Sequence, residues 1–295
     1  MTDEQPPHPD IRKASLLAIL CLCAGLSSLS ARWISNDVLK LSYGLLIAAV
    51  YLAFTVLARK VSSLRRFWEL SFAFFILALV QLLNNSVPSF VGIHILHDPP
   101  VPGNPLASTV SGTVIIQLLG TLVTIVPIIA LTKISGNELS SIYARIGKRS
   151  IWIIAPIISF IIFAIVTVTH HSERLLPTNG TVTLHRLLVL TPALLVLVIS
   201  NGFQEEFLFR GLFLQRYNAF FGVRVSNVLQ AIIFAIAHAG ITYTPASVLF
   251  IVLGVFPLGL FGGYLMRRTN GVVTPALFHA GADIPIYLAF LSYVA

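Results

Sequence analysis

The chain has 295 residues, of which 56% are hydrophobic and only 10% are charged, and its mean hydropathy is +0.89. Soluble domains average about 25% charged residues, so this composition excludes an ordinary soluble protein and indicates a membrane protein. The net charge of +8 does not indicate nucleic-acid binding, because the basic residues lie in short clusters between apolar segments. We therefore expect the lipid bilayer as the surroundings and no nucleic-acid partner.

Apolar segments follow one another along nearly the whole chain after a polar tail over residues 1–13. A transmembrane helix needs ~20 mostly apolar residues, and the first such segment is more typical of a retained helix than of a signal peptide. Nine segments meet or approach this length: 14–32, 39–58, 68–87, 109–132, 151–169, 187–217, 225–239, 246–266 and 272–293. The sequence predicts an all-α, polytopic membrane helix bundle of about nine transmembrane helices.

Along the whole chain, loops rich in Lys and Arg alternate with loops that contain few of these residues. Basic clusters join spans two and three, four and five, six and seven, and eight and nine, whereas residues 88–108 and 240–245 contain no Lys or Arg. The positive-inside rule then places the N-terminus in the cytoplasm and the C-terminus outside. We expect the polar residues His94, His97 and Asp98 of the outer loop to be exposed.

The sixth span contains three ionisable side chains, Glu205, Glu206 and Arg210. Such groups cost at least ~2.5–3.5 kcal/mol each at membrane depth, so they indicate a functional site. Glu206 and Arg210 are four residues apart and can form an ion pair on one helix face, which lowers this cost. Glu205 lies about 100° away around the helix axis and can face another helix. We interpret Glu205 as reactive and the pair as support of the site; the alternative is a structural charge network.

The dipeptide Asn201-Gly202 interrupts the same span, which is longer than one bilayer crossing. A broken helix at membrane depth is tolerated where its free backbone groups line a cavity. Alternatively, the helix only kinks there and Gly202 lies at a contact between helices. The sequence leaves both alternatives open.

Two later spans carry one histidine each, His238 and His279. Counted from the inner basic residues at ~1.5 Å per residue, Glu205, His238 and His279 lie roughly 16, 21 and 16 Å deep. The hydrocarbon core is ~30 Å thick, so all three are predicted to meet near its middle in a membrane-embedded polar cavity. Phe234, one turn before His238, would wall the site. Asp283, one turn after His279, would orient the imidazole or act on the site directly.

These residues form three ordered motifs, Glu205-Glu206-x-x-x-Arg210, Phe234-x-x-x-His238 and His279-x-x-x-Asp283. The set resembles the motifs of the CPBP family of intramembrane proteases, also called the CAAX protease and bacteriocin-processing, or Abi, family. The resemblance implies a catalytic helical core over residues 185–290. The N-terminal transmembrane helices over 14–184 are predicted from hydropathy and loop charge alone. Family members remove the last three residues of prenylated CAAX proteins, or act in bacteriocin self-immunity and peptide maturation.

The resemblance implies an intramembrane endopeptidase in the plasma membrane of a prokaryote, with a membrane-associated protein or peptide as substrate. Glu205 and His238 would activate a water molecule for attack on the peptide bond, and His279 and Asp283 would stabilise the oxyanion. In relatives the last residue can be Asn, which donates a hydrogen bond as it stands. Asp283 donates one only when it is protonated.

Two alternatives remain open. Glu205, His238 and His279 offer a carboxylate and two imidazoles, a candidate ligand set for a divalent metal such as zinc with one open position, although the His-Glu-x-x-His arrangement of common zinc peptidases is missing. A protein of another class, a non-catalytic membrane immunity or peptide-binding and transport protein, also has buried charges and broken helices. Replacement of Glu205 discriminates between this class and an enzyme.

Overall fold

The computed structural model describes residues 11–148, 153–168, 183–239 and 245–295. Most of the predicted polar tail therefore lies outside the described residues, and residues 11–13 form the start of the first helix. Within the described ranges the chain is helical and contains no strands beyond one isolated bridge between Val101 and Asn104. The prediction of an all-α fold is confirmed.

The helices follow the predicted spans closely. In chain order they are α1 (Ile11–Leu29), α2 (Asp37–Lys60), α3 (Trp68–Phe90), α4 (Val110–Ile134), α5 (Ile154–Val168), α6 (Leu184–Glu205), α7 (Leu212–Ala237), α8 (Pro245–Phe250), α9 (Phe256–Thr269), α10 (Val273–Ala282) and α11 (Ile284–Ser292). The short helical segments between them are η1 (Ser30–Trp33), η2 (Ser62–Phe67), η3 (Val91–Ile95), η4 (Leu139–Ile142), η7 (Glu206–Gly211) and η8 (Ile251–Val255). Among the described residues, six helical stretches are long and apolar enough to cross a membrane. The chain is thus a polytopic helix bundle.

The second helix illustrates why these segments fold as spans. The side chain of Asn36 accepts a hydrogen bond from the backbone N–H of Leu39 at 3.0 Å and caps the N-terminus of α2, and basic residues occupy its last turn. Large apolar side chains such as Leu46 and Val50 are exposed on its surface. In water such a surface would be unfavourable, whereas lipid tails solvate it.

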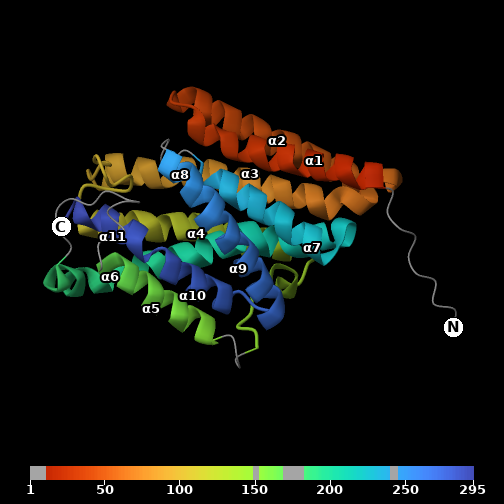
Figure 1. Ribbon diagram of the computed structural model, residues 1–295. Helices are drawn as coiled ribbons and strands as arrows, with labels where there is room; N and C mark the ends of the chain where they lie inside the picture. The colour runs from red at the N-terminus through yellow and green to blue at the C-terminus, as the bar shows by residue number, and fades with distance from the viewer. Residues whose placement is uncertain (1–10, 149–152, 169–182, 240–244) are drawn as a thin grey trace.

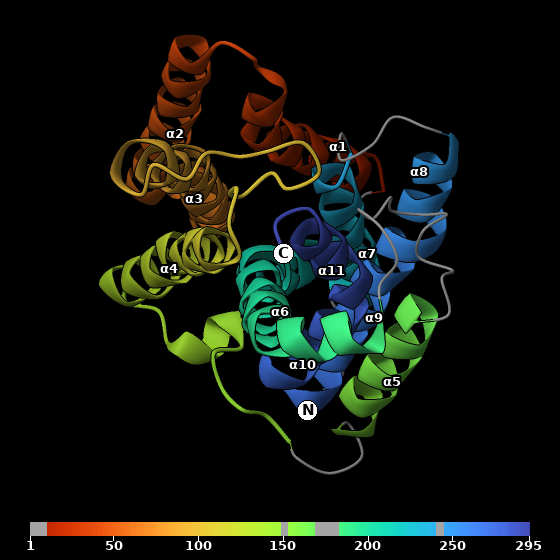
Figure 2. The ribbon, with the colours of Figure 1, turned by 90° about the vertical axis from the view of Figure 1, so that its left-hand side faces the viewer.

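The helices that carry the three motifs lie next to one another. Helices α1 and α2 lie along one side of the bundle beside α3 (Figure 1), whereas α6 lies near the centre when the bundle is turned (Figure 2). Helix α6 packs against α4, α10 and α11, and α9 packs against α7 and α10. The sixth, seventh and ninth predicted spans therefore contribute to one interior region.

The stretch Leu184–Ala237 is helical over 54 residues, which at ~1.5 Å per residue is more than twice the thickness of the hydrocarbon core. It folds back at Gly222, whose φ of 72° and ψ of 174° interrupt α7. Such a positive φ favours glycine because it has no Cβ. This turn separates the two spans that were predicted at 187–217 and 225–239.

Helix α6 continues through Asn201-Gly202 without a break. A Cβ atom on Gly202 would lie 2.3 Å from the carbonyl oxygen of Ala276, so the glycine allows α6 and α10 to approach closely. The second alternative, a glycine at a helix contact, is therefore the correct one. The irregularity lies directly afterwards, where η7 forms a π-helical turn that begins at Glu206.

Candidate active site

Glu205, His238 and His279 meet at the ends of α6 and α7 and within α10. Oε2 of Glu205 lies 3.5 Å from Nε2 of His238 and 3.6 Å from Nε2 of His279. The side chains of Glu205 and His238 keep 19% and 14% of their surface exposed, whereas that of His279 keeps 2%. The carboxylate and the first imidazole are therefore accessible from neighbouring cavities, and the second imidazole forms the buried wall.

Both imidazole rings are fixed through Nδ1. Nδ1 of His238 lies 2.8 Å from the carbonyl oxygen of Phe234, and Nδ1 of His279 lies 3.0 Å from Oε1 of Glu206. Because a carbonyl and an ionised carboxylate only accept hydrogen bonds, we assign a hydrogen to each Nδ1. Both Nε2 atoms then face Glu205; each accepts a proton in the neutral imidazole and donates one only after the ring is protonated.

Glu206, Arg210 and Phe234 support this arrangement from beneath. Nη1 of Arg210 lies 3.0 Å from Oε1 of Glu206, and both side chains are almost wholly buried. The guanidinium Cζ lies 3.9 Å from the centroid of the Phe234 ring, an arrangement that stabilises the cation. The same ring packs against His238 and His279 with centroid distances of 4.6 and 5.5 Å. The expected ion pair is present, and it also orients His279 through Glu206.

Asp283 lies at the same edge of the His279 ring as Glu205, with its Oδ1 3.6 Å from Nε2 of the imidazole. Its other oxygen accepts a hydrogen bond of 2.9 Å from Nδ2 of Asn201, which also donates to Oε1 of Glu205 at 3.4 Å. The two carboxylates are thus bridged by one amide group. Asp283 therefore lies within the cluster, and its Oδ2 acts as an acceptor.

A chain of polar side chains continues from Asn201 and was missed by the motif analysis. The hydroxyl of Tyr287 donates to Oε1 of Gln117 at 2.8 Å. The amide of Gln117 donates to Oε1 of Gln204 at 3.1 Å and to Oδ1 of Asn201 at 3.5 Å. The signal that could have found Asn201 is its position one turn before Glu205, whereas Gln117 and Tyr287 belong to distant spans and have no motif.

Two cavities flank the cluster. A polar cavity of about 150 Å³ is lined by Arg32, Gln81, Asn84, Gln204, Glu205, Leu208, Phe209, Ala237 and His238. A mainly apolar cavity of about 80 Å³ is lined by Phe163, His238, Phe250, Gly254, Val255, Leu258, His279, Ala282, Asp283 and Ile286. His238 borders both cavities. Water and an apolar group can therefore approach the cluster from different sides.

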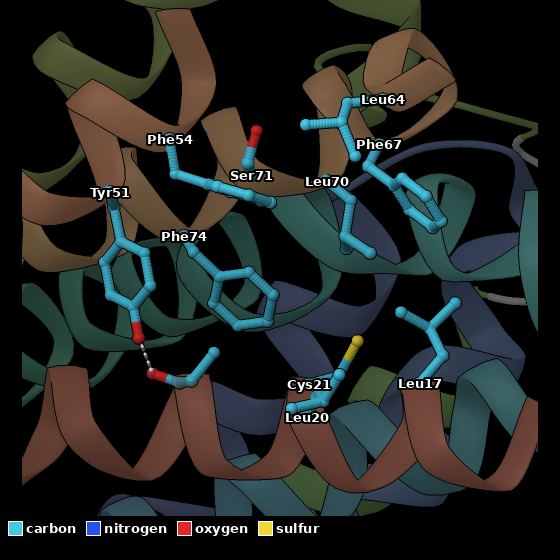
Figure 3. A pocket seen from close by; sticks show the side chains of 11 residues that line it. Leu17, Leu20, Cys21, Tyr51, Phe54, Leu64, Phe67, Leu70, Ser71 and Phe74 are labelled. Atoms are coloured by element: carbon cyan, nitrogen blue, oxygen red, sulfur yellow. Dashed lines mark hydrogen bonds between the residues drawn. The ribbon is translucent and has the colours of Figure 1, made fainter. Parts of the chain in front are cut away.

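A further cavity of about 240 Å³ lies away from these residues, between α1, α2, η2 and α3. Its walls are almost entirely apolar, as Figure 3 shows for Leu17, Phe54 and Phe74. The hydroxyl of Tyr51 there donates to the carbonyl oxygen of Ala24 at 3.2 Å. We do not place the reaction in this cavity because it lacks an acid–base pair.

The donor chemistry of the cluster suits a divalent metal, since each Nδ1 is held by an acceptor and each Nε2 is left towards Glu205. However, no group of three or more His, Cys, Asp or Glu side chains in the described ranges is arranged to hold a metal ion. The zinc set of Glu205, His238 and His279 therefore stays a prediction.

A bundle of membrane-spanning helices that encloses such a cluster is typical of intramembrane enzymes. A comparison with known families identifies the class of enzyme that this bundle resembles. The family model described as type II CAAX prenyl endopeptidase Rce1-like matches residues 186–285. This segment is similar to the Rce1-like family, which is consistent with a CPBP family intramembrane protease, and the resemblance given by the three motifs is confirmed. The match supports an intramembrane endopeptidase at the general level of the family. Searches of curated proteins and of solved structures gave no significant match.

Proposed function

We propose that the protein is an intramembrane endopeptidase that hydrolyses a peptide bond with a water molecule activated by Glu205 and His238. The observation that supports this most strongly is the position of Oε2 of Glu205, 3.5 and 3.6 Å from the Nε2 atoms of His238 and His279. A carboxylate and an imidazole at this spacing can share the proton of one water molecule between them. General acid–base catalysis of this kind typically contributes 10²–10⁴-fold to a rate.

The reaction requires one proton to move twice. Glu205, with His238 beside it, takes a proton from water as the water oxygen attacks the carbonyl carbon of the substrate. The C–N bond then breaks, and the same proton passes to the leaving amine. The products are a new carboxyl group and a new amino group, and the site returns to its starting state.

The oxyanion of the tetrahedral intermediate needs hydrogen-bond donors. His279 provides one when Nε2 carries a proton, and its ring is already fixed by Glu206 through Nδ1. Asp283 accepts a hydrogen bond from Asn201, so we propose that it orients His279 and contributes no donor of its own. This differs from relatives with Asn at that position, whose amide can donate directly.

The substrate is a membrane-associated protein or peptide, and we place the enzyme in the plasma membrane of a prokaryote with a cytoplasmic N-terminus. The buried position of the cluster requires the scissile bond to enter the hydrocarbon region. An extended segment with apolar side chains satisfies this, as does a lipid-modified chain end such as a prenylated CAAX sequence. Bacteriocin and other peptide-maturation substrates fall within the same class.

The test is to trap substrates with Glu205→Gln in native membranes and to map their cut sites by mass spectrometry. We expect the native protein to cleave the trapped proteins and Glu205→Gln to retain but not cleave them. Glu138→Gln, on the loop segment before η4, is the matched control and should cleave normally. A processing or immunity phenotype that survives Glu205→Gln unaltered would instead support the non-catalytic alternative.

Metal dependence is tested on the same substrates. A divalent metal held by Glu205, His238 and His279 would polarise the carbonyl group and lower the pKa of its bound water. Because the proposed reaction activates water with Glu205 and His238 alone, we expect cleavage to persist after exhaustive chelation. Loss of cleavage that zinc restores, together with zinc bound to the purified protein, would assign the three side chains to a metal.

A further inference from the structure

The polar cavity beside Glu205 contains amide groups that have no role in the proposed reaction. Gln81 is 4% exposed, and both it and Asn84 come from α3 to line the cavity. In the part of the chain that the structure describes, neither amide side chain has a hydrogen-bond partner. Buried polar groups are normally paired, so donors that are directed into a cavity indicate a ligand or ordered water there.

A cationic side chain lines the same cavity. Arg32 belongs to η1, directly after α1, far from the catalytic motifs in sequence. Its guanidinium makes neither a hydrogen bond nor an ion pair with any described residue, yet it lies close enough to Glu205 for the two charges to interact. Arg32 is an exposed residue, and the part of its side chain that lines the cavity has no hydrogen-bond or ion-pair partner among the described residues that would compete with an anionic ligand.

Together these side chains have the chemistry of a carboxylate receptor. A guanidinium binds a carboxylate through a planar pair of N–H donors, and neighbouring amide N–H groups satisfy the remaining lone pairs. The cavity of about 150 Å³ has room for such a group together with water. Arg32 also offsets the repulsion that Glu205 would exert on a second negative charge.

We infer that Arg32, Gln81 and Asn84 form a subsite that binds a carboxylate of the substrate next to the bond that is cleaved. The inference rests on the proposed function and adds a specificity element to it. The carboxylate can be the C-terminus of the substrate or an acidic side chain at a fixed distance from the cut. The apolar cavity on the other side of His238 then accepts an apolar part of the substrate.

The probe is a random decapeptide library, prepared once with free C-terminal carboxylates and once with C-terminal amides. The full-length protein in nanodiscs is incubated with each library, and the cut sites are identified by mass spectrometry. In parallel, immobilised Glu205→Gln and Glu205→Gln/Arg32→Gln proteins are used to capture peptides from both libraries. Arg65→Gln, which removes the same charge from the exposed segment η2, is the matched control in both arms.

We expect the native protein to cleave, and Glu205→Gln to capture, carboxylate-bearing peptides at least tenfold better than matched peptides without the carboxylate. Arg32→Gln should reduce this preference to about twofold or less, mainly through KM. Arg32→Lys should retain only part of it, because an ammonium group lacks the planar pair of donors, and Arg65→Gln should leave it unchanged. A preference for free acids over amides assigns the C-terminal carboxylate. Enrichment of Asp or Glu at one position in both libraries assigns a side chain.

The two proposals fail in different ways. Cleavage with an acid preference that Arg32→Gln leaves unchanged, or with no acid preference, overturns the subsite and leaves the endopeptidase intact. Arg32-dependent capture of acids without any cleavage by the native protein supports the subsite and overturns the endopeptidase. The absence of both cleavage and capture contradicts both proposals.

Discussion

At the scale of single residues, Asn201 connects the parts of the site. Its amide donates to Asp283 and to Glu205, and its carbonyl oxygen lies 3.5 Å from the amide nitrogen of Gln117. This bridge keeps two carboxylates near one imidazole without a direct contact between them. Asn201 thereby fixes the direction in which Oε2 of Glu205 points.

We predict that Asn201→Leu lowers the rate of substrate cleavage by about tenfold to a hundredfold, because the two carboxylates lose a shared donor and Glu205 loses its orientation. The effect should be mainly on kcat, since Asn201 does not line either cavity next to the cluster. Cleavage of a trapped substrate by purified protein measures it. An unchanged kcat in a folded Asn201→Leu protein would remove Asn201 from the mechanism.

Asp98 was predicted to be an exposed loop residue, and this prediction is wrong. It is 7% exposed, and its Oδ1 accepts hydrogen bonds from the backbone N–H and the hydroxyl of Ser108 at 2.6 and 2.5 Å. The hydroxyl of Thr109 donates to Oδ2. Burial raises the pKa of Asp98, but these hydrogen bonds outweigh burial and hold its pKa below the usual range. The carboxylate ties the loop to the start of α4.

Asp98 is predicted to make the stability of the protein depend on pH. Because its pKa is lower in the folded state, its contribution is present above the unfolded pKa of about 3.9 and is lost as pH falls through the folded pKa. Asp98→Asn should therefore lower the free energy of unfolding by about 1.5–3 kcal/mol at pH 7. Thermal unfolding in detergent from pH 7 down to pH 3 should show this difference shrinking; a difference that is constant with pH would contradict the assignment.

At the scale of elements, the hydropathy of the chain predicted the spans well, because each helix must cover the hydrocarbon core. The boundary of α2, predicted at 39–58 and observed at Asp37–Lys60, shows how closely length follows bilayer thickness. Hydropathy could not distinguish a break at Asn201-Gly202 from a tight helix contact. That distinction depends on which backbone approaches Gly202, here the carbonyl of Ala276 on α10, and on the π-helical turn of η7 that follows.

We predict that Gly202→Ala destabilises the protein because the added methyl group would lie 2.3 Å from the carbonyl oxygen of Ala276. Helices α6 and α10 would have to separate, which costs typically 1–3 kcal/mol for such overpacking and shifts His279 relative to Glu205. Gly254→Ala is the matched control, since its nearest new contact is an ordinary one of 3.4 Å with the Phe250 ring. Thermal unfolding in detergent measures both; equal stability of the two variants would contradict the close contact.

At the scale of the whole molecule, counting residues from the inner basic loops was sufficient to predict that three side chains distant in sequence lie at the same depth in the membrane. The meeting of Glu205 with His238 and His279 was predictable because a bilayer fixes the depth of each helix. The contributions of Arg32, Gln117 and Tyr287 were not predictable, since the lateral order of helices leaves no periodic signal in the sequence. Neighbouring helices such as α4 and α6 supply these contacts.

The predicted orientation of the bundle is tested by labelling. With Cys21 and Cys23 replaced by Ala, we expect an impermeant maleimide added to intact cells to label His97→Cys and not Ser63→Cys, because the basic loops face the cytoplasm. Permeabilised cells should label both and serve as the control. The reverse pattern would place the N-terminus outside.

The central claim is that the carboxylate and imidazole of two different helices act on water as one unit. The most direct measurement is the hydrolysis rate of a trapped substrate by Glu205→Gln, His238→Gln and the double variant. We predict that each single change lowers the rate by about 10²–10⁴-fold and that the double variant is no slower than the slower single variant. Hydrolysis that persists in Glu205→Gln, or losses that multiply in the double variant, would contradict the account.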